Sequence, residues 1–337
     1  MRVTIFILLF FSVILAFFSA NEGVVELTPS SSVAQTMYDL GLPKPSHFRE
    51  NLSAEEVERG RQLVWFGTTA NPPLGESSTP ISRFFTCVTC HNIVREDPFL
   101  TEVNPDARLT YALEKRIPYL QGSTFWGIVN RTSWYNDNYI LKYGELVDKA
   151  RNSLEESTQL CALVCSQGRT LEQWELDAII AYFWSLEMNL GDLGLDDPEK
   201  LAKLAKLPAS SSLEQIQDLF IPKSPATFGE PPSDKDAGYG LKGDASRGQG
   251  IYELGCQHCH RQGGGSDVIL DDFKSTFKWL KRNIPDDSPL SIYEIVRHGT
   301  YSETGHRPYM PHYTKEKLND HQLEDLRAYI ELKASGK

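Results

Sequence analysis

The 337-residue chain lacks the residue patterns that mark several large enzyme classes. It shows no Ser-His-Asp set, no pair of acids placed for acid–base chemistry and no glycine loop that would cradle a phosphate. Positive charge is also in deficit, because 34 Lys and Arg residues face 45 Asp and Glu residues, for a formal net charge of -11. Such an acidic surface argues against nucleic acid and anionic lipid as partners. It favours partner proteins with a basic docking patch, with mere solubility as the alternative role of the charge.

Long apolar runs are equally scarce. A single one, residues 3–20, follows Arg2 and ends before the first acidic residue, Glu22. It predicts a secretory signal peptide or a membrane anchor over residues 1–20. The rest of the chain is then expected to be periplasmic or otherwise extracytoplasmic, either soluble or held by the N-terminal segment.

Cysteine is rare, with six residues in the whole chain, and four of them belong to two copies of one pattern. The copies are Cys87-Val88-Thr89-Cys90-His91 and Cys256-Gln257-His258-Cys259-His260. Cys-x-x-Cys-His is the attachment motif of c-type haem, because two thiols at this spacing reach both vinyl groups of one porphyrin and the next residue presents imidazole to the iron. A zinc ribbon, redox dithiol or disulfide would not need histidine after both second cysteines. We therefore predict two covalently bound haem c groups, haem 1 on Cys87 and Cys90 with His91 as iron ligand, and haem 2 on Cys256 and Cys259 with His260 as iron ligand.

The two motifs lie in an internal repeat. A capping box at residues 53–56 opens a predicted helix that contains Gly60, and Asp244 caps a second predicted helix that contains Gly248. Glycine costs the interior of a helix about 1 kcal/mol, so its repetition predicts a point where another backbone comes close. The expected partner helices, residues 174–183 and 323–330, both end near an Ala-Tyr pair.

This order of helix, motif, loop and last helix resembles the class I cytochrome c fold, in which the first and last helices cross at a glycine. The resemblance covers nearly all of residues 244–333 and is looser over 53–190, where a Pro-, Gly- and Ser-rich segment, residues 66–86, precedes the motif. That segment also resembles the corresponding part of bacterial dihaem peroxidases. The resemblance implies an all-α fold of two tandem cytochrome c-like domains, a divergent one at 51–190 and a second at 244–337. Residues 21–50 are expected to be a polar lead-in, and 191–243 a partly extended linker with short helices near 198–207 and 213–220.

The resemblance also implies the sixth iron ligand of haem 2. Met310 stands between Tyr309 and Pro311, where class I cytochromes place a methionine ligand, with a simple core methionine as the alternative. Ligation by His and Met raises the reduction potential and leaves no open position on the iron.

The corresponding position of the first repeat holds Cys161 and Cys165 instead of methionine. We expect a disulfide between them, since an exported chain oxidises spare cysteines and this spacing lies near the limit of disulfide reach. A thiolate ligand to haem 1, as in thiosulfate-oxidising dihaem cytochromes, is the alternative, and Met188, His47 or no ligand are others. Arg131, in the aromatic stretch 125–137, is a candidate partner for a haem propionate.

These patterns predict an extracytoplasmic dihaem cytochrome c that carries electrons between redox partner proteins. The alternative is a dihaem oxidoreductase, thiosulfate dehydrogenase-like or cytochrome c peroxidase-like, with catalysis at haem 1. A subunit docked on a larger respiratory complex is a third interpretation.

Overall fold

The computed structural model describes residues 27–300 and 308–336, so the predicted signal peptide or anchor lies outside the described residues. Within these ranges the chain is helical and forms no named strand, which confirms the predicted all-α class. No helix in the described ranges is long and apolar enough to cross a membrane. The α-helices are α1 (Val33–Asp39), α2 (Ala54–Phe66), α3 (Pro105–Lys115), α4 (Asp137–Tyr143), α5 (Leu154–Leu160), α6 (Gln173–Trp184), α7 (Pro198–Leu204), α8 (Ala209–Gln217), α9 (Ala245–Ile251), α10 (Gln257–His260), α11 (Lys274–Asn283), α12 (Ile292–His298) and α13 (Asp320–Ser335).

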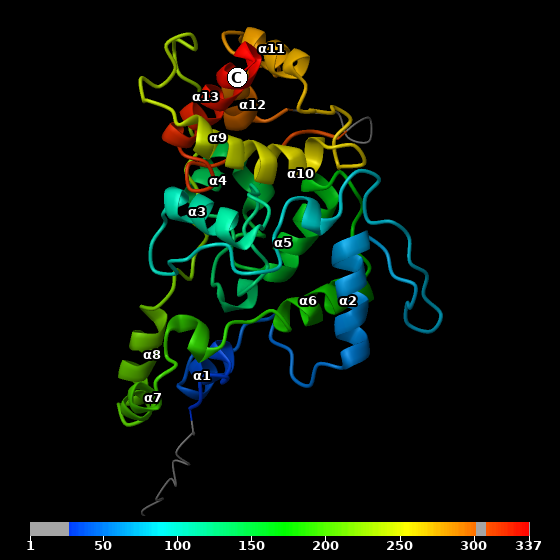
Figure 1. Cartoon of the computed structure of the whole chain (residues 1–337). Coiled ribbons are helices and arrows are strands. Elements are labelled where there is room, and N and C mark those ends of the chain that lie inside the picture. Colours follow the sequence, from blue (N-terminus) through cyan, green and yellow to red (C-terminus); the bar gives the residue numbers. More distant parts are fainter. Residues whose placement is uncertain (1–26, 301–307, 337) are drawn as a thin grey trace, which may run out of the picture.

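Two crossed helix pairs, α2 with α6 and α9 with α13, organise the fold (Figure 1). Each crossing requires a glycine. A Cβ atom placed on Gly60 would lie 1.8 Å from the carbonyl oxygen of Ala178, and one placed on Gly248 would lie 1.9 Å from that of Asp325. These distances are far shorter than any van der Waals contact, so the predicted close approach of backbones is confirmed at both glycines.

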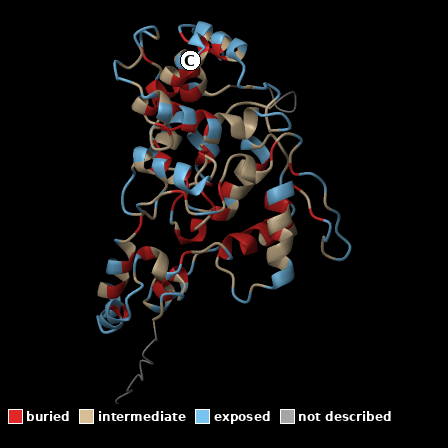
Figure 2. Ribbon diagram, in the orientation of Figure 1, coloured by how far each residue is buried: buried red, intermediate tan, exposed pale blue. Residues whose placement is uncertain are grey.

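The helix pairs contribute to two separate apolar cores. We call residues 51–190 the first segment and residues 244–337 the second segment. Figure 2 shows the last helix of each, α6 and α13, as largely buried. The boundary between the cores does not follow the boundary between the segments, because Leu109 and Ala112 of α3, with Tyr119, pack in the core of the second segment. The two segments are therefore in direct contact.

The lead-in and the linker are more ordered than their composition suggests. The two short helices expected in the linker are present as α7 and α8. The lead-in contains α1, whose N-cap Ser32 accepts a hydrogen bond from the amide of Gln35. Val33 and Met37 of α1 pack with Leu201 and Ile216 in a third apolar cluster. Figure 1 shows these helices together at the end of the molecule opposite α11.

Candidate functional site

Both motif histidines are oriented in the same way. Nδ1 of His91 lies 2.7 Å from the carbonyl oxygen of Ser123, and Nδ1 of His260 lies 2.7 Å from that of Val268. A carbonyl accepts the Nδ1 proton, which leaves Nε2 as the lone-pair nitrogen that a metal binds. Burial lowers the pKa of both imidazoles and favours this neutral form. The residues present therefore fit an iron ligand in each motif.

The local backbone brings the Ser123 carbonyl to His91. A Cβ atom on Gly122 would lie 2.5 Å from the carbonyl oxygen of Cys90 and 2.7 Å from Nδ1 of His91, so only glycine lets the chain pass this close. The ring of Phe125 stacks on the imidazole at a centroid distance of 4.5 Å. His91 is thus held from two sides.

The attachment cysteines are available as thiols. Burial raises the pKa of Cys87 to about 11 and that of Cys256 to about 12. All six cysteines of the chain are free in the structure. A thioether forms when the S–H of such a cysteine adds across a vinyl group, so these side chains fit the predicted attachment.

The two motifs touch each other. Nε2 of His258 lies 3.3 Å from the carbonyl oxygen of Val88, and Sγ of Cys259 lies 3.8 Å from that of Thr89. A Cβ atom on Gly265 would lie 3.0 Å from Cγ2 of Thr89. The peptides predicted to bind haem 1 and haem 2 are direct neighbours.

Paired hydrogen bonds join the backbone of Met310 to Thr300. The Met310 amide donates to Oγ1 of Thr300 at 2.7 Å, and the Thr300 amide donates to the Met310 carbonyl at 2.8 Å. Met310 and Cys256 pack against the same apolar core. Met310 thus shares a core with the second motif, and its ligation of iron remains a prediction.

The predicted disulfide between Cys161 and Cys165 is wrong, because both thiols are free. The two cysteines begin and end a π-helical turn. The interaction between their side chains raises the pKa of Cys161 and lowers that of Cys165. Ala162 of this turn packs in the same apolar core as Cys87, so the turn lies near the first motif. π-Helical turns inside helices are frequent at functional sites.

The other candidates for the sixth ligand of haem 1 are packed in cores. Nε2 of the buried His47 lies 3.3 Å from the carbonyl oxygen of Val129, and its ring lies against Trp134 and Trp184. Met188 belongs to the third apolar cluster, with Val33. Packing explains both residues without a metal.

Arg131 lies beside the loop that holds His91. Its guanidinium donates to Oγ of Ser224 at 2.9 Å and, together with Ser123, lines a cavity of about 110 Å³. Burial lowers the pKa of Arg131. The proposed role toward a propionate stays a prediction.

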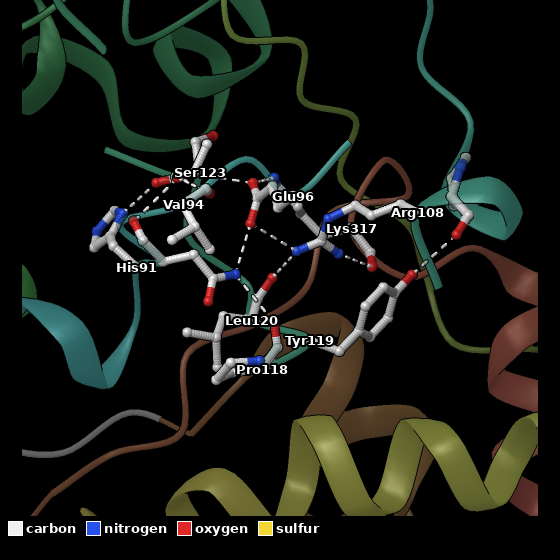
Figure 3. Close-up of polar contacts among 12 residues, drawn as sticks. His91, Val94, Glu96, Arg108, Pro118, Tyr119, Leu120, Ser123 and Lys317 are labelled. Carbon is white, nitrogen blue, oxygen red and sulfur yellow. Dashed lines mark hydrogen bonds and ion pairs between the residues drawn. The ribbon is translucent and has the colours of Figure 1, made fainter. Parts of the chain in front are cut away.

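Sequence reasoning missed a buried charge cluster next to this loop, drawn in Figure 3. Glu96 pairs with Arg108 at 3.2 Å and with Lys317 of the second segment at 2.6 Å. Burial alone would raise the pKa of Glu96, but the charges of Lys317 and Arg108 hold it well below its usual range. No local pattern could have found this cluster, since Glu96 and Lys317 are 221 positions apart.

Comparison with known families agrees with the second motif. The sequence model of one family, described as cytochrome C oxidase, cbb3-type, subunit III, matches residues 243–330. The match includes Cys256, Cys259, His260 and Met310 and lies outside the first motif. Comparison with curated proteins and with solved structures finds no match.

The family match and the geometry agree for the second segment. Residues 243–330 match a c-type cytochrome domain, which supports covalently bound haem c and haem-based electron transfer in general. Cytochrome c domains are typically extracytoplasmic.

Proposed function

We propose that this protein is an extracytoplasmic dihaem cytochrome c that passes electrons between redox partner proteins through two adjacent haems. The observation that carries this proposal is the contact between the motifs, in which Sγ of Cys259 lies 3.8 Å from the carbonyl oxygen of Thr89. Cys90 follows Thr89 directly, so one short gap and a few covalent bonds separate the sulfur of one attachment site from the sulfur of the other. An electron that enters at either haem has a short route to the second.

The chain's own residues suit this role. When bound, each haem supplies one-electron redox chemistry. The carbonyls of Ser123 and Val268 hold the tautomer of the two histidines, and Met310 is the proposed sixth ligand of haem 2. A six-coordinate site whose ligands are fixed by hydrogen bonds changes charge with little rearrangement.

The test is a haem count. We expect the intact mass of protein matured with a haem-attachment system to exceed the mass of the apo-chain by two haem groups. Replacing Cys87 and Cys90 by serine should remove one group, and replacing Cys256 and Cys259 should remove the other. A mass with one haem in the unaltered protein would refute the dihaem proposal.

The free thiols favour a second candidate function, a dihaem oxidoreductase with catalysis at haem 1. Cys161 and Cys165 flank Ala162, which packs in the same core as Cys87 of the first motif, and neither cysteine is consumed in a disulfide, so either could supply a thiolate ligand. A low-spin thiolate signal in electron paramagnetic resonance that is lost in Cys161→Ala or Cys165→Ala would favour a thiosulfate dehydrogenase-like enzyme. A high-spin haem that reacts with peroxide would favour a peroxidase-like one.

A further inference from the structure

The carboxylate of Glu96 is the centre of a buried hydrogen-bond network (Figure 3). Its Oε2 accepts from Nδ2 of Asn92 at 2.9 Å and from Nη2 of Arg108 at 3.2 Å. Its Oε1 accepts from the amide of Thr124 at 3.0 Å and from Nζ of Lys317 at 2.6 Å. Every acceptor direction of this carboxylate is used, so its position is closely fixed.

Two of these bonds hold the chain on either side of His91. Asn92 follows His91, and Thr124 follows Ser123, whose carbonyl accepts the Nδ1 proton of His91. Oγ1 of Thr124 also donates to the carbonyl of Asn92 at 3.1 Å, which ties the two stretches together. Glu96 therefore holds in place both the backbone next to His91 and the backbone next to Ser123, whose carbonyl orients His91.

The other two bonds come from buried cations, one of them in the second segment. The side chains of Glu96 and Arg108 are each 2% exposed, and that of Lys317 is 11% exposed. Nη1 of Arg108 donates to the carbonyl of Lys317 at 3.1 Å, and Leu318, the next residue, is part of the core of the second segment. Charges withdrawn from water act on their neighbours far more strongly than charges on the surface do.

We propose that Glu96 and Lys317 are positioning residues for haem 1, which set its reduction potential through His91 and make that potential depend on the second segment. The proposal rests on the attachment of haem 1 at Cys87 and Cys90. The oxidised iron carries one more positive charge than the reduced iron, so a nearby buried cation disfavours oxidation and a nearby buried anion favours it.

The test is the reduction potential of each haem, measured by spectroelectrochemistry in the full-length holoprotein. Lys317→Met removes a cation and should lower the potential of haem 1, while Glu96→Gln removes an anion and should raise it. Each shift should be about tenfold in the one-electron equilibrium constant, or ~59 mV. Lys317→Arg should keep the original potential. The potential of haem 2, whose ligand His260 is oriented by Val268 and not by this network, should change less than that of haem 1 in every variant.

The matched control is Lys315→Met, which removes a cation that is 42% exposed and paired with Asp320. Water and salt screen such a charge, so the potential of haem 1 should stay unchanged. Opposite shifts in Lys317→Met and Glu96→Gln distinguish electrostatic control from simple loosening of the fold, which would move both potentials in one direction. Shifts of the same sign, or no shift, would overturn the proposal.

Glu96→Gln leaves two buried cations without their counter-charge, which destabilises a fold strongly. If that variant does not accumulate, the double variant Glu96→Gln/Lys317→Met takes its place and should have a higher haem 1 potential than Lys317→Met alone. An equal or lower potential would overturn the proposal. A holoprotein whose mass lacks the group on Cys87 and Cys90 would instead refute the proposed dihaem function, and this inference with it.

Discussion

The glycine at the crossing of α9 and α13 gives the sharpest test of the fold. Gly248→Ala adds a Cβ atom 1.9 Å from the carbonyl oxygen of Asp325 and 2.9 Å from Cβ of Tyr329. The helices would have to separate by roughly 1.5 Å to restore an ordinary contact distance. Overpacking of this kind costs about 1–3 kcal/mol, against a gain of about 1 kcal/mol from the better helix propensity of alanine. We therefore expect a net loss of up to about 2 kcal/mol in the free energy of unfolding.

The same helix offers a matched control. A Cβ atom on Gly250 would lie 2.7 Å from Cδ2 of Leu113, the far end of a flexible side chain, so the neighbour can move aside. Gly250→Ala should therefore leave stability unchanged or raise it by up to about 1 kcal/mol. Urea unfolding followed by circular dichroism measures both variants. Equal stability of Gly248→Ala and Gly250→Ala would refute the argument that backbone contact dictates glycine at this crossing.

Three other predictions concern the sites. Met310→Ala should abolish the sulfur-to-iron charge-transfer band of the oxidised protein and lower the potential of haem 2, since axial ligands tune haem over about 0.8 V. If the variant kept both the band and the potential, a residue other than Met310 would be the sixth iron ligand. Tyr309→Phe removes the 2.8 Å hydrogen bond from Tyr309 to the carbonyl of Cys165 but keeps the ring against Phe85. Alkylation of Cys165 in the native protein should therefore become about fivefold faster. An unchanged rate would show that this hydrogen bond does not restrain the backbone at Cys165. The pKa of Glu96 is lower in the folded protein than the value of about 4.3 in an unfolded chain. The Glu96 carboxylate therefore stabilises the fold above about pH 4.3, and this stabilisation is lost as the pH falls toward the folded pKa. Acid titration of the unfolding free energy should show this loss in the unaltered protein and a smaller one in Glu96→Gln.

The parts of the fold that sequence reasoning predicted are those with a local signal. Capping residues and apolar periodicity mark the helices, and a glycine inside a helix marks a close approach, as Gly60 and Gly248 confirm. Helix α1 was not predicted, because seven residues provide little periodic signal and its burial depends on contact with α7 and α8. The disulfide was predicted from the expected export of the chain and from the spacing of the two cysteines, and neither reports that Cys161 and Cys165 lie in a π-helical turn with free thiols.

In the candidate site too, the residues that are adjacent in the sequence could be predicted, and those that come together from distant positions could not. Five adjacent residues specify each attachment motif, so the sequence names both. The residues that surround the first motif come from far along the chain, and three of them belong to the second segment: His258 contacts Val88, Tyr309 contacts Cys165, and Lys317 contacts Glu96. No pattern of local spacing encodes such pairs.

These three contacts also bear on why the two repeats differ. The candidate ligands of the proposed haem 2, His260 and Met310, both lie within the second segment. Side chains of the same segment complete the surroundings of the first motif, the proposed attachment site of haem 1. A first segment whose environment is supplied from outside needs fewer of the features that make an isolated cytochrome domain self-sufficient. The contact of Leu109 and Tyr119 with the second core extends this dependence to the apolar packing. The packing of the first segment against the second gives the second segment the means to influence the iron of the proposed haem 1.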